Sequence, residues 1–172
     1  GLLPEDVKED RFTGLEKSIF KVYKIYQNKI RELNACDFGD LILYCVKLFE
    51  NHSDIRKIYN NNFKYILVDE FQDTNFIQNK WLNLLVNEQQ NICCVGDDDQ
   101  SIYSWRGAEI KNFLTFDHIY KNCKVFKLEQ NYRSTKNILE TASTLISRNK
   151  GRVEKKLWSS AQQGEKVKLN CY

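Results

Sequence analysis

The chain has 172 residues, of which 42% are hydrophobic and 28% are charged, and its formal net charge is +3. This length and composition are typical of a soluble globular protein. No apolar run is long enough to span a bilayer, and no secretory signal pattern is present, so we expect a cytoplasmic protein. The small positive charge permits contact with nucleic acid but does not by itself indicate it.

The six cysteines form no C-x-x-C pair and only two histidines could join them, so a zinc site is not expected. Cys93 and Cys94 lie in an apolar run, which favours reduced thiols that face the core. The chain has no methionine and opens on Gly1, from which we infer a processed or deliberately cut chain. The cysteines are Cys36, Cys45, Cys93, Cys94, Cys123 and Cys171.

Amphipathic helices are expected in the first third of the chain. Apolar residues recur at steps of three and four over residues 12–35, which predicts a long helix whose start is capped by Thr13 and Glu16. A second helix is expected at about residues 40–50, and a short helical turn after Ser53. The apolar face of the long helix comprises Phe12, Leu15, Ile19, Val22, Tyr26, Ile30 and Leu33.

From residue 65 onward, short apolar runs alternate with helical patterns. Such runs are typical of buried parallel strands, and their alternation with helices predicts an α/β fold with a parallel sheet. Strands are expected at residues 65–68, 92–95 and 125–128, with a last half-buried strand at 167–171. Helices are expected at residues 76–87 and 109–116, and from a cap at Ser134 or Thr135 to about Arg148.

Two of these strands end in acidic residues, at Asp69–Glu70 and at Asp97–Asp99. In parallel sheets, ligands bind beyond the carboxyl ends of the strands, so the pattern indicates a polar, metal-binding site at this edge. A carboxylate at a strand tip can hold Mg²⁺, and the next carboxylate can deprotonate an attacking water. The strand alone leaves open that the first pair is merely a solvated surface pair.

The longer strings around these acids are more specific. They read DEFQDTN at residues 69–75, VGDDDQSIYSWRGA at 95–108 and LEQNYRS at 128–134. In this order and spacing they closely resemble motifs II, III and IV of the UvrD/Rep family of superfamily 1 helicases. The resemblance covers about residues 36–152. It includes the segment DFGD at 37–40, where Gly39 departs from the aspartate that is more frequent in the family.

The resemblance implies a nucleotide site. By analogy, Asp69 would hold Mg²⁺ and Glu70 would be the catalytic base of ATP hydrolysis. Gln100 would reach the γ-phosphate, since an amide can donate to a phosphate oxygen and also accept from water. Tyr132 would stack on the adenine, and the planar fork of Arg133 would bind the γ-phosphate. Without the resemblance, Gln100 could be an ordinary turn residue. Tyr132 and Arg133 could be a pair at a helix start, with Arg133 exposed to solvent.

The same resemblance implies a contact with single-stranded DNA at Tyr103, Trp105 and Arg106. Aromatic faces stack on bases regardless of sequence. The alternative is that both aromatics are core residues, as large aromatics usually are. Arg106 could instead brace the tryptophan or join the two sites. We interpret Asp97–Asp99 as a solvated turn and expect no second metal there.

A phosphate-binding loop would read G-x-x-x-x-G-K-[ST]. None of the seven glycines is followed by lysine, so this chain does not contain that loop. We therefore expect residues 1–36 to be the remnant of an inserted helical subdomain, and residues 37–128 to be the rear half of a first RecA-like motor domain. Residues 129–172 would begin the second motor domain. The sheet would be partial, RecA-like and flanked by helices.

The implied function is that of a fragment of an ATP-dependent 3′-to-5′ DNA helicase, with ATP and Mg²⁺ as cofactors and single-stranded DNA and duplex junctions as partners. Two alternatives stay open: the motor portion of a helicase-nuclease subunit, and a non-catalytic single-stranded-DNA-binding module. Without the central loop strand, two sheet edges would be unpaired. We expect direct pairing of 92–95 with 125–128, dimerisation through the exposed edges, or disorder.

Overall fold

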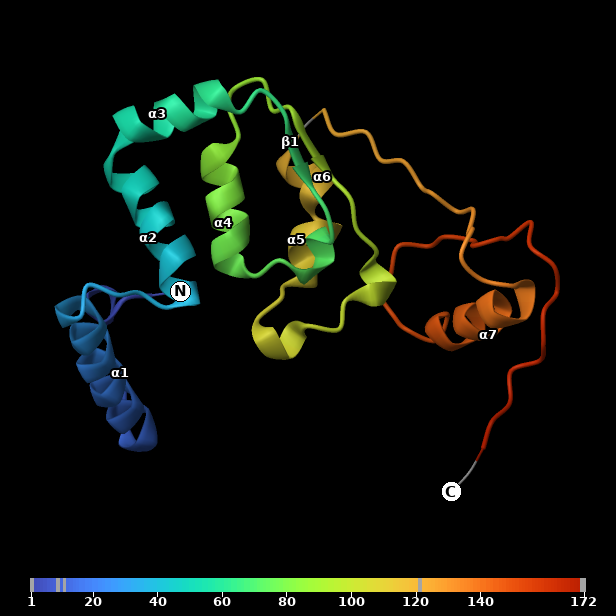
Figure 1. The fold of residues 1–172 in the computed structure, drawn as a ribbon, viewed down its shortest axis with the longest axis horizontal. Coiled ribbons are helices and arrows are strands. Elements are labelled where there is room, and N and C mark those ends of the chain that lie inside the picture. The colour runs from blue at the N-terminus through green and yellow to red at the C-terminus, as the bar shows by residue number, and fades with distance from the viewer. Residues whose placement is uncertain (1, 9, 11, 121, 171–172) are drawn as a thin grey trace.

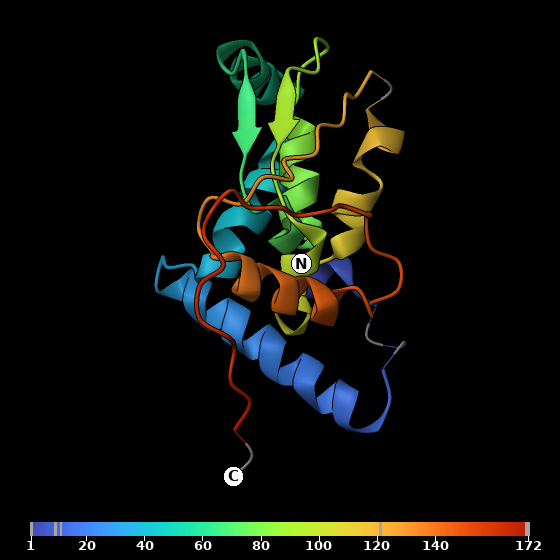
Figure 2. The ribbon, with the colours of Figure 1, turned by 90° about the vertical axis from the view of Figure 1, so that its right-hand side faces the viewer.

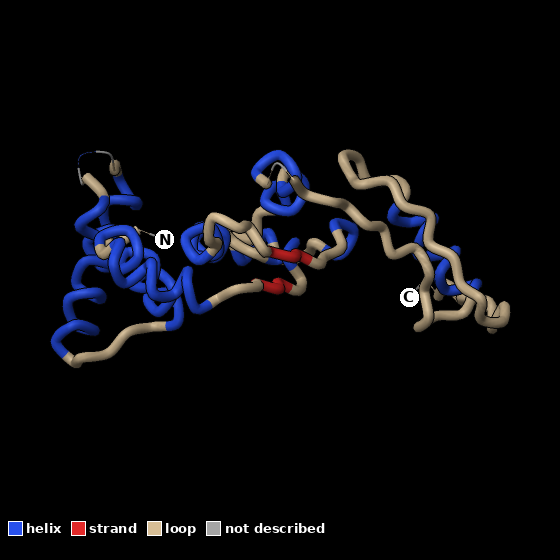
Figure 3. The backbone as a smooth tube through the Cα atoms, turned by 90° about the horizontal axis from the view of Figure 1, so that it is seen from above, coloured by secondary structure: helices blue, strands red, loops and turns tan. Residues whose placement is uncertain are grey.

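The computed structural model describes residues 2–8, 10, 12–120 and 122–170. Figure 3 shows three parts in succession: the first helices, a small sheet with its helices, and a C-terminal arm, which we define as residues 122–170. The strands are β1 (Ile66–Val68) and β2 (Ile92–Cys94). The helices are α1 (Gly14–Glu32), α2 (Phe38–Asn51), α3 (Ser53–Asn62), α4 (Phe76–Leu85), α5 (Ile110–Leu114), α6 (Phe116–Ile119) and α7 (Lys136–Ile146). Short 3-10 turns are η1 (Pro4–Asp6), η3 (Phe71–Asp73), η4 (Asp98–Gln100) and η5 (Ser104–Arg106).

Helix α1 extends away from the remaining helices (Figure 1), so most of its apolar face has no covering element. Leu15, Ile19 and Val22 are exposed, whereas Phe20 and Gln27 are buried. The predicted helix is confirmed, but its capping box is not, because the Thr13 side chain makes no capping hydrogen bond. Among the described residues, no helix has the length and apolar character that crossing a membrane requires.

The core lies where α2 packs against α3 and α4. Helix α2 begins at an aspartate cap: Asp37 accepts from the backbone N–H of Asp40 at 2.8 Å. Asp40 is itself buried and accepts from Gln27 of α1 at 3.0 Å, which joins the two helices. Asn60 of α3 donates to the carbonyl of Leu85 at 2.6 Å and so satisfies the end of α4. The buried apolar side chains here are Leu43, Val46, Phe49, Leu82 and Leu85.

Strands β1 and β2 pair in parallel, with Leu67 opposite Cys93. Figure 2 shows α4 behind the two strands. Side chains alternate along a strand, so Leu67, at 79% exposure, and Cys93 lie on the uncovered face. The prediction of strands buried on both faces is therefore wrong for these residues. The expected α/β class, with a partial parallel sheet flanked by helices, is confirmed.

The cysteines of the described residues are free thiols, as predicted. Cys94 is half-buried, and this burial raises the pKa of its thiol to about 12. Cys93, Cys36 and Cys45 are exposed, so the expectation that Cys93 faces the core is wrong. Cys171 lies outside the described residues.

Residues 125–128 and 167–170 are not strands, which corrects two predictions. Val125, Phe126 and Leu128 are exposed, at 65%, 79% and 85%. A strand needs a neighbour to accept its amide hydrogen bonds, and none of the described strands pairs with either segment. Direct pairing of 92–95 with 125–128 is thus not found among the described residues. The last position of the second predicted strand, 171, lies outside them.

Candidate functional site

The two acids of the first motif lie at the carboxyl end of β1. Glu70 adopts a left-handed backbone conformation (φ 49°, ψ 41°), which is uncommon for a residue with a side chain. Asp69 Oδ1 accepts from the backbone N–H of Glu70 at 2.9 Å, and both side chains are exposed. Because the chain turns sharply into η3 here, the two carboxylates are held just beyond the strand tip. This is the edge at which the sequence predicted a site.

Gln72 joins this strand tip to the next one. Its side chain is 1% exposed. Its Nε2 donates to Glu70 Oε2 at 2.7 Å, and its Oε1 accepts from the backbone N–H of Asp97 at 3.0 Å. A Cβ at Gly96 would stand 2.6 Å from that Oε1 and 2.8 Å from the Phe113 ring, so this position needs glycine. The sequence analysis quoted Gln72 within its motif but assigned it no role.

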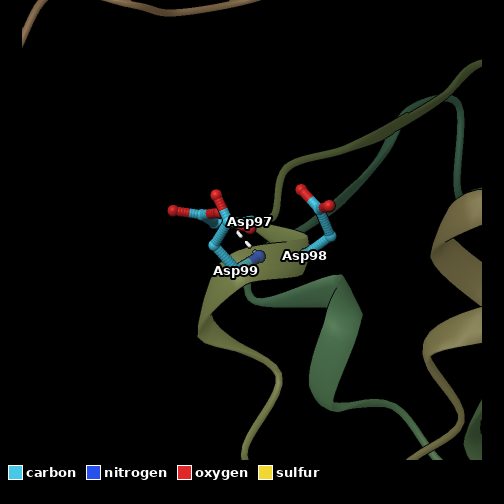
Figure 4. Close-up of side chains that lie close together, drawn as sticks. All are labelled: Asp97, Asp98 and Asp99. Carbon is cyan, nitrogen blue, oxygen red and sulfur yellow. Dashed lines mark hydrogen bonds between the residues drawn. The ribbon is translucent and has the colours of Figure 1, made fainter. Parts of the chain in front are cut away.

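Asp97 and Gln100 form the second half of the site. Asp97 caps η4 by accepting from the backbone N–H of Asp99 at 3.0 Å (Figure 4). Its Oδ2 accepts from Gln100 Nε2 at 2.6 Å, so the exposed Gln100 side chain is held beside the strand tip. Glu70 and Gln100 are therefore connected through Gln72 and Asp97. The sequence predicted that the motifs at residues 69–75 and 95–108 lie at one sheet edge. In the structure, hydrogen bonds join them there.

The aspartate triplet, Asp97–Asp99, is not the solvated turn that the sequence suggested. The side chains of Asp98 and Asp99 are 5% and 11% exposed. Lys155 contacts all three carboxylates, and Arg152 forms a salt bridge to Asp99 at 2.5 Å. The triplet is shielded from water because a distant segment of the chain folds over it, which local sequence could not indicate.

The pKa values of the triplet follow from these contacts. The hydrogen bond from Arg152 lowers the pKa of Asp99 below its ordinary value. For Asp97, burial raises the pKa, but the hydrogen bonds from Lys155 and Gln100 more than offset it, and the pKa is lowered. Three acidic ligand atoms lie within 4.8 Å of one another, yet two cations already pair with them. This charge balance gives no reason to place a metal ion there.

The predicted DNA contact lies on the loop around η5. The Trp105 side chain is 78% exposed, which argues against the core alternative. The rings of Tyr103 and Trp105 are 6.3 Å apart. Arg106 Cζ lies 5.6 Å from the first ring centroid and 5.8 Å from the second, a cation–π arrangement. Arg106 thus braces both aromatics and leaves a face of tryptophan available for stacking.

Tyr132 and Arg133 lie in the C-terminal arm, before α7. Tyr132 is 82% exposed, and its hydroxyl donates to Gln130 at 2.7 Å. Asn131 Oδ1 accepts from the backbone N–H groups of Arg133 and Ser134, at 3.0 and 2.8 Å, and so shapes the turn. Within the described residues, no hydrogen bond or salt bridge joins either predicted nucleotide contact to Asp69, Glu70 or Gln100. The structure therefore does not bring these two groups together.

Two family models match the chain. The UvrD/REP helicase N-terminal domain matches residues 1–121, and the UvrD-like helicase C-terminal domain matches residues 126–171. The chain belongs to the UvrD/REP helicase family. The expected resemblance is thereby confirmed. The matched region includes the residues at the tips of β1 and β2 that we call the strand-tip site: Asp69, Glu70, Gln72, Asp97 and Gln100.

The chain is also similar to relatives that are named DNA helicases. The chain is 47% identical over 174 residues to a probable DNA helicase II homolog of Rickettsia conorii, covering 100% of this chain and 27% of the relative. It is 45% identical to the ATP-dependent DNA helicase PcrA of Staphylococcus epidermidis, covering 95% and 22%. It is also 45% identical to DNA helicase II of Escherichia coli, covering 99% and 24%. The chain thus spans about a quarter of the length of these UvrD/REP relatives.

Proposed function

We propose that this chain is part of an ATP-dependent DNA helicase, which couples ATP hydrolysis to 3′-to-5′ movement on single-stranded DNA and to duplex unwinding. The observation that carries the proposal is the connected strand-tip site, in which Gln72 joins Glu70 of one motif to Asp97 of the next. The relatives named DNA helicase support the same function. The cytoplasm, expected from the sequence, stays a prediction.

Glu70 is the proposed general base of hydrolysis. Its carboxylate is exposed, and one oxygen is held by Gln72. Asp69 is the proposed ligand of Mg²⁺, and it fits this ion because an exposed carboxylate at a strand tip offers a hard oxygen ligand. When bound, Mg²⁺ would neutralise charge on the phosphates of ATP. Gln100, beside Asp97, is the proposed contact to the γ-phosphate.

The other proposed contacts are to the adenine and to DNA. The exposed ring of Tyr132 supports stacking on adenine, and Arg133 would meet the γ-phosphate once the arm approaches the strand tips. The exposed Trp105, with Tyr103 and Arg106, supports stacking on the bases of single-stranded DNA. Each of the two described strands has an edge with no strand beside it, which supports the proposal that the chain dimerises through its exposed sheet edges.

We also propose three regions within the chain. Residues 1–36 would be the remnant of a helical subdomain, 37–128 part of the first motor domain and 129–172 the start of the second. The cap at Asp37, which starts α2, supports the first boundary. The second boundary lies a few residues after the point at which the two family models meet, between residues 121 and 126, which supports it.

The substitution Glu70→Gln in the full-length enzyme that contains this chain tests the function. Removing the carboxylate while Asp69 stays should keep ATP binding and lower steady-state DNA-stimulated ATPase by about 10²–10⁴-fold, the usual contribution of one general base. Glu88→Gln, at an exposed position after α4, is the matched control and should behave as wild type. An ATPase rate of Glu70→Gln within a few-fold of wild type would exclude the assignment.

A further inference from the structure

The C-terminal arm reaches back to the strand-tip site at the aspartate triplet. Arg152 presents a fork to Asp99, with Nε donating to Oδ1 at 2.8 Å and Nη2 to Oδ2 at 2.5 Å. The backbone N–H of Val153 donates to Asp98 at 2.7 Å, and Lys155 contacts all three aspartates. The two cations belong to the segment matched by the C-terminal family model, and the acids to the segment matched by the N-terminal one. The contact therefore joins two modules.

These cations hold the triplet in its conformation. Three carboxylates this close repel one another, and most of their surface is removed from water. Burial lowers the pKa of Lys155, but its hydrogen bonds to Asp97 and Asp99 outweigh this and raise it. Losing one cation would leave buried charge uncompensated, which is strongly unfavourable. We expect the turn at Asp97–Asp99 to rearrange when either cation is removed.

A rearrangement of this turn would change the position of the Glu70 side chain, because Gln72 is hydrogen-bonded to both. A backbone N–H can only donate, so the Asp97 N–H requires the acceptor Oε1 of Gln72 to face it. The donor Nε2 must then point the other way, and Glu70 is the group it meets. Gln72 is fully buried, so a shift of the Asp97 backbone displaces the amide that holds Glu70. Gln100 is held more directly, by the Asp97 side chain.

We propose that Arg152 and Lys155 are positioning residues, which orient Glu70 and Gln100 through the aspartate triplet and Gln72. The roles of Glu70 and Gln100 rest on the function proposed above. The hydrogen bonds and salt bridges of both cation side chains go to the triplet and not to Glu70 or Gln100, so we infer that each cation acts through the triplet. In this way the placement of the C-terminal module sets the geometry of the two groups proposed to act on the γ-phosphate and on water.

The test uses the full-length enzyme and measures DNA-stimulated ATPase with saturating single-stranded DNA. Lys155→Gln and Arg152→Gln should each lower kcat by about tenfold, a modest part of what a misplacement of about 1 Å costs, while the KM for ATP changes by less than about twofold. Lys156→Gln is the matched control, because only the backbone of this exposed lysine makes a hydrogen bond, to Glu129. Its kcat should equal that of wild type.

Two further variants separate positioning from loss of folded protein. Arg152→Lys keeps a positive charge beside Asp99, so its kcat should stay within about threefold of wild type. Lys155→Gln added to Gln72→Met should lower kcat by less than the product of the two single effects, because the path to Glu70 runs through Gln72 whereas the path to Gln100 does not. All variants are assayed below their unfolding temperatures, which are measured separately.

The outcomes are distinct. A wild-type kcat for Lys155→Gln and Arg152→Gln overturns the proposal. So does a loss of kcat that Arg152→Lys shows to the same extent as Arg152→Gln, or a loss for Lys155→Gln that adds fully to that of Gln72→Met. If Glu70→Gln is inactive in the same assay while the cation variants are not, positioning fails and the proposed function stands. If Glu70→Gln keeps its activity, the proposed function itself fails.

Discussion

At the scale of single residues, the site depends on conformations that few residues can adopt. Glu70 has a positive φ, which for a non-glycine residue costs on the order of 1 kcal/mol or more and persists only where its surroundings impose it. Those surroundings are the Asp69 carboxylate on its N–H and Gln72 on its side chain. Strain of this kind is frequent at functional sites, which agrees with the proposed role of Glu70.

Trp105→Ala should weaken binding of single-stranded DNA by the full-length enzyme by about 5- to 150-fold, the equivalent of losing one stacked base at about 1–3 kcal/mol. DNA-stimulated ATPase should fall more than the basal rate, because the basal rate needs no strand. Fluorescence anisotropy with a labelled oligonucleotide measures the affinity. Tyr65→Ala, which removes an exposed aromatic beside β1, is the control. Unchanged affinity of Trp105→Ala would show that the ring does not stack on DNA.

Tyr132→Ala should raise the KM for ATP by removing the ring on which adenine stacks, with a smaller effect on kcat. Tyr132→Phe keeps the ring and loses only the hydroxyl bond to Gln130, so its KM should stay near that of wild type. Steady-state kinetics of the full-length enzyme measure both. A normal KM for Tyr132→Ala combined with a lowered Tm would mean that the residue serves packing instead.

At the scale of elements, hydrogen bonds between the segments that follow β1 and β2 keep the motifs at residues 69–75 and 95–108 together. Phe71 N–H donates to the Val95 carbonyl at 3.0 Å, and Val95 N–H donates to the Val68 carbonyl at 2.8 Å, so the ladder continues one step beyond the strands. Gln72 then occupies the space that the missing side chain of Gly96 leaves. The carboxyl ends of β1 and β2 are thus locked in register by backbone and side chain together.

Gly96→Ala should therefore destabilise the protein by about 1–3 kcal/mol, the usual cost of adding a methyl group to a packed interior. The new Cβ would overlap the Gln72 amide at 2.6 Å and the Phe113 ring at 2.8 Å, and both must move. Thermal unfolding measures the change in Tm. Gly39→Ala is the comparison: its Cβ would meet only Asp37 Oδ1, at 3.2 Å, so a smaller change is expected. Equal Tm values for Gly96→Ala and wild type would contradict the packing argument.

At the scale of the whole molecule, the chain is extended (Figure 3), and hydrogen bonds to the aspartate triplet join the arm to the centre. Besides the triplet contact, the arm is folded on itself by a parallel bridge between Gln130 and Trp158. The exposed Tyr132 and Arg133 are not joined to the strand tips in the described residues. A complete nucleotide site would need both a phosphate-binding loop and an approach of the arm.

The 172-residue chain by itself should therefore show no ATPase above background, with or without single-stranded DNA, because it contains no loop to cradle the β- and γ-phosphates. It should still bind single-stranded DNA weakly through Trp105, and ATP should not change that affinity. A coupled phosphate-release assay and an anisotropy titration with and without ATP measure the two properties. Phosphate release stimulated by single-stranded DNA would contradict the expectation.

Sequence alone determined what local pattern controls. Apolar periodicity located α1, α2 and α4, and a cap signal located α7. Apolar runs located β1 and β2, and the order of three motifs identified the family. It also placed the acids at one edge, because parallel strands share a direction. Residue types and spacing suffice for these features, since each depends on neighbours within a few positions.

The tertiary structure alone decided the features that need a distant partner. Residues 125–128 have the apolar character of a strand but stay outside the sheet, because pairing requires a second chain segment beside them. The aspartate triplet reads as a solvated turn until Lys155, more than fifty residues later, reaches it. In the sequence, nothing distinguishes Gln72 from the other residues of its motif. In the fold, its amide nitrogen meets Glu70 and its amide oxygen meets the backbone N–H of Asp97. Hydrogen bonds and charge pairs across such separations depend on packing geometry, which no local pattern encodes.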